Sequence, residues 1–169
     1  MISLRVLQPD DLDQLIGVYR DAVISQAVGL YTPAQIAAWS QQAAQSNVLR
    51  DSLRYGHGVA SCALDDPTRI EAFGILDPGD RLALLYCRGQ ACRQGRASAI
   101  LERLTDHARQ QGVQQLRTEA SQLSRPLLLR RGWSVEAEET VQLGNQGFLR
   151  WRMIRPLHPQ PMSAGSSHG

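Results

Sequence analysis

The 169-residue sequence predicts one α/β domain of the α+β type, with a mixed sheet of roughly six to seven strands and about four helices. Three observations carry this prediction. Apolar residues recur with alternating periods of two and 3.6, in the order β-α-α-β-β-β-α-β-α-β-β. One strand leads through a basic loop straight into a helix between Arg81 and Leu104. Two long strands near the C-terminus are joined by Gly144-Asn145-Gln146, a hairpin signal.

The first half of the chain reads as a strand, two helices and two further strands. Asp10 favours a helix start after the first strand, because acids suit the first turn of a helix. Thr32-Pro33 begins the second helix, with Thr32 as the cap. Strands are expected at residues 2–7, 57–64 and 69–76, with a polar connection over 41–47.

The centre of the chain combines a strand, a basic loop and a helix. The apolar run Leu82–Cys87 precedes the loop Arg88–Gln94, and a helix is expected from about Gly95 to Gly112. A helix N-terminus offers unpaired N–H groups, and a glycine there lets a ligand approach the backbone. We interpret Arg88, Arg93 and Arg96 as additional donors for phosphate.

The second half continues with a strand at 113–120, a helix opening at Ser121 and ending at Gly132, and strands at 134–143 and 147–154. The domain is therefore expected to span residues 1–155. Residues 156–169, rich in Pro, Ser, Gly and His, are expected to be a flexible tail.

Composition excludes several classes of function. A net charge of +2 gives no reason to expect a nucleic-acid partner. The chain has no apolar run long enough for a membrane span and no signal-peptide core, so we expect a cytoplasmic protein without membrane contact. Its three cysteines, Cys62, Cys87 and Cys92, lack metal-ligand spacing and are interpreted as reduced thiols. No metal is expected.

The loop sequence Cys92-Arg93-Gln94-Gly95-Arg96-Ala97 resembles the Q/R-x-x-G-x-G/A motif of the GNAT N-acetyltransferases. The resemblance covers roughly residues 2–155, includes Gly132-Trp133 where the family usually has Gly-Phe, and departs at Cys92. It implies the GNAT fold, with acetyl-CoA as co-substrate and no metal. The loop amides would hold the pyrophosphate, and the preceding strand would bind the pantetheine arm. The cofactor residues implied are Leu85, Cys87, Arg93, Gln94, Gly95, Arg96, Ala97, Ser98 and Ser121.

The implied activity is transfer of an acetyl group to a primary amine by direct attack in a ternary complex. A lysine-like amine has a pKa near ~10.4, so a base must remove its proton. The family's usual positions for this base and for the acid hold Ala83 and Leu128 here. Glu119, at the end of a strand, is the first candidate and Tyr86 the second, although Glu119 is equally consistent with an exposed or ion-paired carboxylate.

The acceptor is expected to be a small-molecule or peptide amine. The sequence leaves the oligomeric state open, with a homodimer as one option by analogy with the family. Tyr31 and Trp39 are interpreted as acceptor-pocket residues, or equally as helix packing. Glu136, Glu138 and Glu139 would suit a cationic acceptor, but an exposed strand edge explains them better. The alternative function is a non-catalytic GNAT-fold protein that binds acyl-CoA as a sensor.

Overall fold

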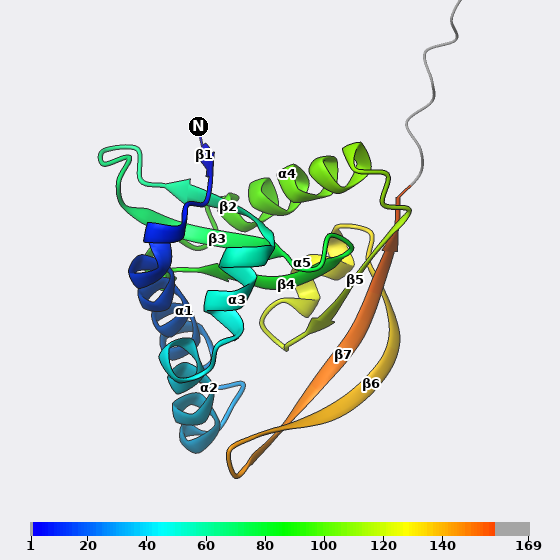
Figure 1. The fold of residues 1–169 in the computed structure, drawn as a ribbon. Coiled ribbons are helices and arrows are strands. Elements are labelled where there is room, and N and C mark those ends of the chain that lie inside the picture. Colours follow the sequence, from blue (N-terminus) through cyan, green and yellow to red (C-terminus); the bar gives the residue numbers. More distant parts are fainter. Residues whose placement is uncertain (1, 158–169) are drawn as a thin grey trace, which may run out of the picture.

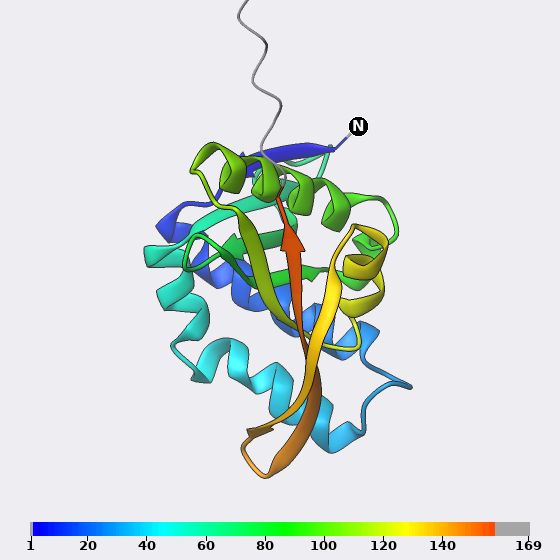
Figure 2. The same ribbon diagram turned by 90° about the vertical axis from the view of Figure 1, so that its right-hand side faces the viewer.

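The computed structural model describes residues 2–157 as a mixed sheet with helices on both faces (Figures 1 and 2). The seven strands are ordered β1-β2-β3-β4-β5-β7-β6. The strands are β1 Ser3–Val6, β2 His57–Cys62, β3 Ile70–Leu76, β4 Arg81–Cys87, β5 Gln115–Ala120, β6 Ser134–Leu143 and β7 Gln146–Pro156. The helices are α1 Leu12–Gln26, α2 Pro33–Gln45, α3 Val48–Tyr55, α4 Arg96–Gln110 and α5 Arg125–Arg130, with short turns η1 Pro9–Asp11 and η2 Gly89–Ala91.

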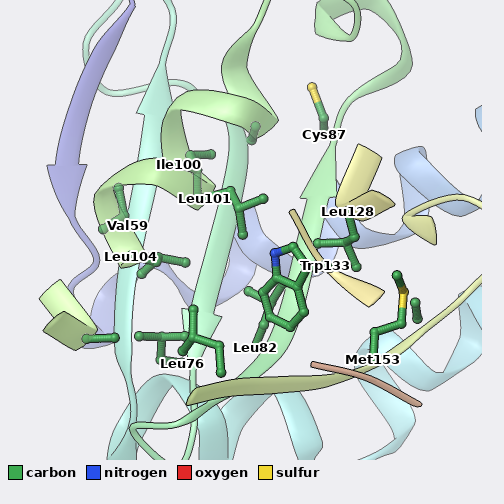
Figure 3. Packing of buried hydrophobic residues seen from close by; sticks show 14 of the residues in the cluster. Val59, Leu76, Leu82, Cys87, Ile100, Leu101, Leu104, Leu128, Trp133 and Met153 are labelled. Carbon is green, nitrogen blue, oxygen red and sulfur yellow. The ribbon is translucent and has the colours of Figure 1, made fainter. Parts of the chain in front are cut away.

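Two apolar layers fill the space on either side of the sheet. On one face α4 packs Ile100, Leu101 and Leu104 against the sheet, where Leu76 and Leu82 lie close by (Figure 3). On the other face α1 and α2 pack against the alternate residues of β3 and β4, including Phe73, Ile75 and Leu84. This alternation follows from the two-residue period of a strand. The site described below lies between these two layers.

Local sequence signals explain where the first helices begin. Thr32 and Gln35 form a reciprocal capping box, in which the Gln35 amide donates to Thr32 Oγ1 at 3.1 Å and the Thr32 amide donates to Gln35 Oε1 at 2.9 Å. Asp11 ties β1 to the turn before α1, because Arg5 donates to both of its oxygens at 2.8 and 2.9 Å.

The structure corrects the sequence-based elements in two places. The polar connection expected over 41–47 belongs as far as Gln45 to helix α2, and residues 48–55, for which no element was predicted, form helix α3. This helix is short and buries only Leu49 and Ser52, so its apolar period is too brief to recognise. The domain also continues past 155: β7 ends at Pro156, and the buried Leu157 donates its amide to Gln114 O at 2.8 Å. The rest of the predicted tail, 158–169, lies outside the described residues.

The sheet opens between β4 and β5. These parallel strands pair only at Arg81–Arg117 and Leu82–Thr118, after which β5 continues along β7 instead (Figure 1). The register of β3 with β4 shifts between Leu76–Leu82 and Ile75–Leu84, so Ala83 is an extra residue in a bulge. The second half of β4 therefore has a partner strand on one side only. None of the helices in residues 2–157 is long and apolar enough to cross a membrane.

Candidate functional site

A groove of about 870 Å³ lies in the opening beside β4, bounded by α1, the start of α4 and the segment leading into α5. Of the nine cofactor residues implied by the sequence, eight line it: Leu85, Cys87, Arg93, Gly95, Arg96, Ala97, Ser98 and Ser121. Gln94 does not, because its side-chain oxygen accepts a hydrogen bond from Arg96 Nε at 3.2 Å. The groove thus gathers residues from three separate segments of the chain.

The loop before α4 has the backbone shape of an anion cradle. Arg93 and Gly95 both have positive φ, at 62° and 83°, and Gly95 is the cap of the 15-residue helix α4. Such left-handed residues at a helix N-terminus turn successive N–H groups toward one concavity. The same loop is fixed to α1, since Asp21 Oδ1 accepts from the Gly89 amide at 2.8 Å.

Two of the three arginines predicted to meet phosphate serve a different purpose. Arg96 is buried and donates to Ser61 Oγ at 2.7 Å and to Cys62 O at 3.0 Å. Arg88 donates through Nε to Ile70 O at 3.1 Å. Both side chains tie the loop to the sheet, because buried backbone oxygens at the strand ends need donors. Among the described residues, only Arg93 of the three has no such partner.

The backbone of β4 offers unpaired groups to the groove. The Arg88 amide donates to Glu71 O. In an antiparallel pair every second residue exchanges backbone hydrogen bonds with the neighbouring strand, so the backbones of Tyr86 and Leu84 also bond to β3. The backbone groups of Leu85 and Cys87 therefore point away from β3, into the opening. Gln26 Nε2 donates to Cys87 O at 2.6 Å, which is consistent with this direction. The sequence implied that Leu85 and Cys87 contribute backbone contacts, and in the structure both residues line the groove.

A second, smaller cavity of about 200 Å³ adjoins the groove. Leu85, Tyr86, Ser121 and Ser124 line both spaces, so the two meet at the middle of β4. Tyr31 and Trp39 line the smaller cavity together with Phe148 of β7, and the three rings form one cluster with centroids 5.2–6.2 Å apart. Tyr31 and Trp39 were interpreted as acceptor-pocket residues or as helix packing. Both interpretations apply to the same contacts, because the two residues pack the α2 region onto β7 and also line the cavity.

Tyr86 lies at the junction of the two spaces. Its hydroxyl accepts a hydrogen bond from Trp39 Nε1 at 3.2 Å, and its ring lies 4.3 Å from that of Tyr19. Burial raises the pKa of Tyr86 well above its ordinary value of 10.0. The group therefore stays protonated at neutral pH, which suits a proton donor and not a base.

Glu119 also lines the smaller cavity, where it is paired with Arg81. Arg81 Nε donates to Glu119 Oε2 at 2.9 Å, and about a quarter of the Glu119 side chain is accessible. Both alternatives for this residue therefore hold together: it is ion-paired and it borders the space where an acceptor would lie. Leu128, at the family's acid position, is fully buried in the same cavity wall and offers no proton.

His57, Glu71 and the acidic cluster do not line either cavity. His57 stacks on His107, with ring centroids 3.6 Å apart and an interplanar angle of 5°. Glu71 accepts from Arg69 at 2.8 Å. The acidic cluster lies on β6, which is the edge of the sheet, and its Glu139 accepts from Arg150 at 2.9 Å. The cluster thus follows the edge strand, and through its ion pair with Arg150 its Glu139 also lies beside the smaller cavity.

Sequence reasoning missed several residues of the smaller cavity, namely Arg81, Ser124, Phe148 and Arg150. Arg81 and Arg150 lie on strands far apart in the sequence, and nothing local shows which cavity a strand residue borders. Phe148 and Arg150 do follow the alternation of β7, which would have placed them on one face of the sheet. No group of three or more potential metal ligands occurs in residues 2–157.

Comparisons with known proteins agree with this geometry. No protein-family model matches the chain. The "Uncharacterized N-acetyltransferase YafP" of Escherichia coli K12 is 26% identical over 160 residues, which is 93% of this chain and 98% of that protein. The chain thus has the fold of the GNAT N-acetyltransferases and is similar over most of its length to a protein named as an N-acetyltransferase.

Solved structures share the same fold at low sequence identity. A Rhodopseudomonas palustris protein described as "GCN5-Related N-acetyltransferase: Aminotransferase, Class-II" superposes with a TM-score of 0.86 at 17% identity, covering 93% of this chain and 96% of that one. The PaiA N-acetyltransferase of Thermoplasma acidophilum, solved with coenzyme A, gives 0.73 at 16% identity, covering 93% and 99%. A phosphinothricin acetyltransferase from Sinorhizobium meliloti, solved with acetyl-CoA, gives 0.63 at 16% identity, covering 98% and 97%.

Proposed function

We propose that this protein transfers an acetyl group from acetyl-CoA to a primary amine of a small molecule or peptide, by direct attack in a ternary complex. The observation that carries the proposal is the junction of the two cavities at Leu85 and Tyr86. A cofactor in the groove would present its reactive end there, and an acceptor in the smaller cavity would meet it. Such an arrangement replaces a bimolecular encounter with a positioned one.

The residues of the groove fit coenzyme A. The amides of the loop 93–98 and the Arg93 side chain would bind the pyrophosphate, because they combine helix-terminal N–H groups with a guanidinium. The backbone of Leu85 and Cys87 would bind the pantetheine arm as an added strand does. Ser121 would contribute a hydroxyl at the far side of the groove. The coenzyme A and acetyl-CoA complexes of two structural neighbours support this choice of ligand.

Acetyl-CoA supplies the acetyl group as a thioester, and the chain must handle two protons. We assign Glu119, held by Arg81, to accept the proton of the amine directly or through water. Tyr86, which stays protonated at neutral pH, would donate a hydrogen bond to the departing thiolate. The thiol of Cys87 has its pKa raised to about 12 by burial, so it stays protonated and is a poor acetyl carrier. This supports direct attack by the amine.

A non-catalytic acyl-CoA-binding role is the second candidate function. One observation favours it: Leu128 fills the cavity wall where the family's acid would lie, and Glu119 is already ion-paired. Both candidate functions require the groove to bind acetyl-CoA. They differ in whether an amine releases free thiol from it.

Thermal melting with about 1 mM acetyl-CoA, ATP or NADH tests the cofactor site first. We expect a higher Tm with acetyl-CoA alone, since a ligand at a hundredfold excess over its Kd adds about 2.7 kcal/mol to the free energy of unfolding. No shift with acetyl-CoA would overturn both functions. Thiol release with a panel of amines, corrected for hydrolysis, then separates them: acceleration by an amine supports transfer, and none supports the sensor.

A further inference from the structure

Two arginine–glutamate ion pairs lie at the smaller cavity, Arg81 with Glu119 and Arg150 with Glu139 of β6. Among its described lining residues, Arg81 and Arg150 are cationic and Glu119 is the only carboxylate. The register also places Arg152 opposite Glu119 on the same face of the sheet, which adds a third guanidinium nearby.

Both guanidinium groups are held at one edge and open at the other. Arg150 uses Nε for Glu139 at 2.9 Å, and no contact of its Nη atoms occurs within the described part of the chain. Arg81 uses Nε for Glu119 and Nη1 for Asp77 O at 3.3 Å, which leaves Nη2. A guanidinium anchored in this way presents its remaining N–H groups in a fixed plane, a geometry that matches a carboxylate.

The rest of the cavity lining is largely apolar and aromatic. Tyr31, Trp39 and Phe148 form its aromatic wall, and Leu84, Leu128, Val141 and Leu143 complete it. At about 200 Å³ the space is smaller than the usual range for drug-sized ligands of roughly 300–1,000 Å³. It therefore suits a molecule of amino-acid size with an apolar body better than a polyamine or a long peptide.

We infer that the acceptor is a small primary amine that also carries a carboxylate and an apolar or aromatic side chain, as an amino acid of the phenylalanine or tryptophan type does. This inference rests on the proposed function. The carboxylate binds Arg150 and the free edge of Arg81, and the aromatic ring packs against Trp39 and Phe148. The amine then lies between Glu119, which accepts its proton, and the junction with the groove.

The test compares amines that differ only by the carboxylate. L-phenylalanine is compared with phenethylamine and L-tryptophan with tryptamine, by kcat/KM for thiol release from acetyl-CoA. We expect each amino acid to exceed its decarboxylated partner at least tenfold, and Arg150→Gln to reduce that ratio about tenfold. Arg103→Gln, a matched change at an exposed site on α4 outside both cavities, should leave the ratio unchanged.

The failure of this inference is separable from the failure of the proposed function. Turnover that is equal for both partners, or better for the decarboxylated amine, would overturn the acceptor class and leave acetyl transfer intact. If no amine is turned over, calorimetric titration of L-phenylalanine and phenethylamine into the protein saturated with coenzyme A decides the matter. Tighter binding of the amino acid that weakens in Arg150→Gln supports the inference, and equal or absent binding overturns it.

Discussion

Glu119 illustrates how one side chain can satisfy a structural partner and border a reactive space. Its carboxylate accepts from Arg81 and also lines the cavity next to Tyr86. We expect Glu119→Gln to keep the shape of the side chain while losing the proton acceptor, so that kcat/KM falls about 10²- to 10⁴-fold. The acetyl-CoA melting shift should remain, because the residue does not line the groove.

The control for this prediction is Glu138→Gln, the same change at an exposed position of β6. It should alter kcat/KM by less than about twofold, as expected for a surface residue away from the site. If Glu119→Gln behaves like the control, Glu119 is a structural carboxylate and the base must be sought elsewhere or in solvent.

The start of helix α4 depends on the backbone conformation of Gly95. Gly95 has φ of 83°, and an added Cβ would meet no atom closer than Ile2 Cδ1 at 3.5 Å, so conformation and not space requires glycine here. We expect Gly95→Glu to lower the free energy of unfolding by about 1–2 kcal/mol and to abolish the acetyl-CoA melting shift, since it places a negative charge in the anion cradle.

Gly112 provides a matched control at the other end of α4. Its φ is 80° with open space around it, so Gly112→Glu carries a similar backbone strain and the same charge away from the groove. The control should lose stability and keep the acetyl-CoA shift. A retained shift in Gly95→Glu as well would remove this loop from the cofactor site.

The junction of β1 with α1 depends on an ion pair whose stability contribution varies with pH. Hydrogen bonding to Arg5 lowers the pKa of Asp11 below its ordinary value of 3.8. A depressed carboxyl pKa contributes stability above the unfolded value, and the contribution is lost as pH falls through the folded one. We expect Asp11→Asn to cost about 1–2 kcal/mol at pH 7, reduced by the partial exposure of Arg5.

Urea unfolding of both proteins at pH 7 and near pH 3 checks this expectation. The two free energies should converge at the lower pH, where Asp11 begins to bind a proton and its advantage shrinks. A difference that stays constant with pH would show that Asp11 contributes through packing and not through its charge.

The sequence was sufficient for the elements with long apolar periods and for the backbone of the cofactor loop. The β6–β7 hairpin, the strand–loop–helix of β4 and α4, and the glycine at the start of that helix all follow from local patterns. Helix α3 did not, because its two buried positions leave too little periodicity to detect.

Side-chain directions in the site needed three-dimensional information. Arg96 was expected at the phosphates, yet it turns inward to Ser61 and Cys62, whose strand end lies next to it only in the folded sheet. Arg81 and Arg150 border one cavity although 69 positions separate them in the chain, as their numbers show. Such long-range pairings depend on strand order, which local propensity does not specify.

At the scale of the whole molecule, the opening between β4 and β5 leaves amides of a central strand without a partner strand. We expect the amides of Leu85 and Cys87 to exchange hydrogen quickly in the free protein and to become protected when acetyl-CoA is added. Hydrogen exchange read by mass spectrometry checks this, with Phe73 and Ile75 of β3 as buried internal references. Strong protection of β4 in the free protein would contradict the open geometry.

The split sheet has a consequence for how this protein could be stabilised. Extending the β4–β5 pairing beyond its two residue pairs would add hydrogen bonds worth about 0.5–1.5 kcal/mol each. It would also close the space that the groove occupies. Substitutions selected only for a higher Tm would therefore favour continuous β4–β5 pairing, which raises thermal stability and abolishes ligand binding. Stability and ligand binding compete here for the same backbone groups. A stabilised variant that still binds its ligand must therefore gain stability from the two apolar layers and keep β4 and β5 apart.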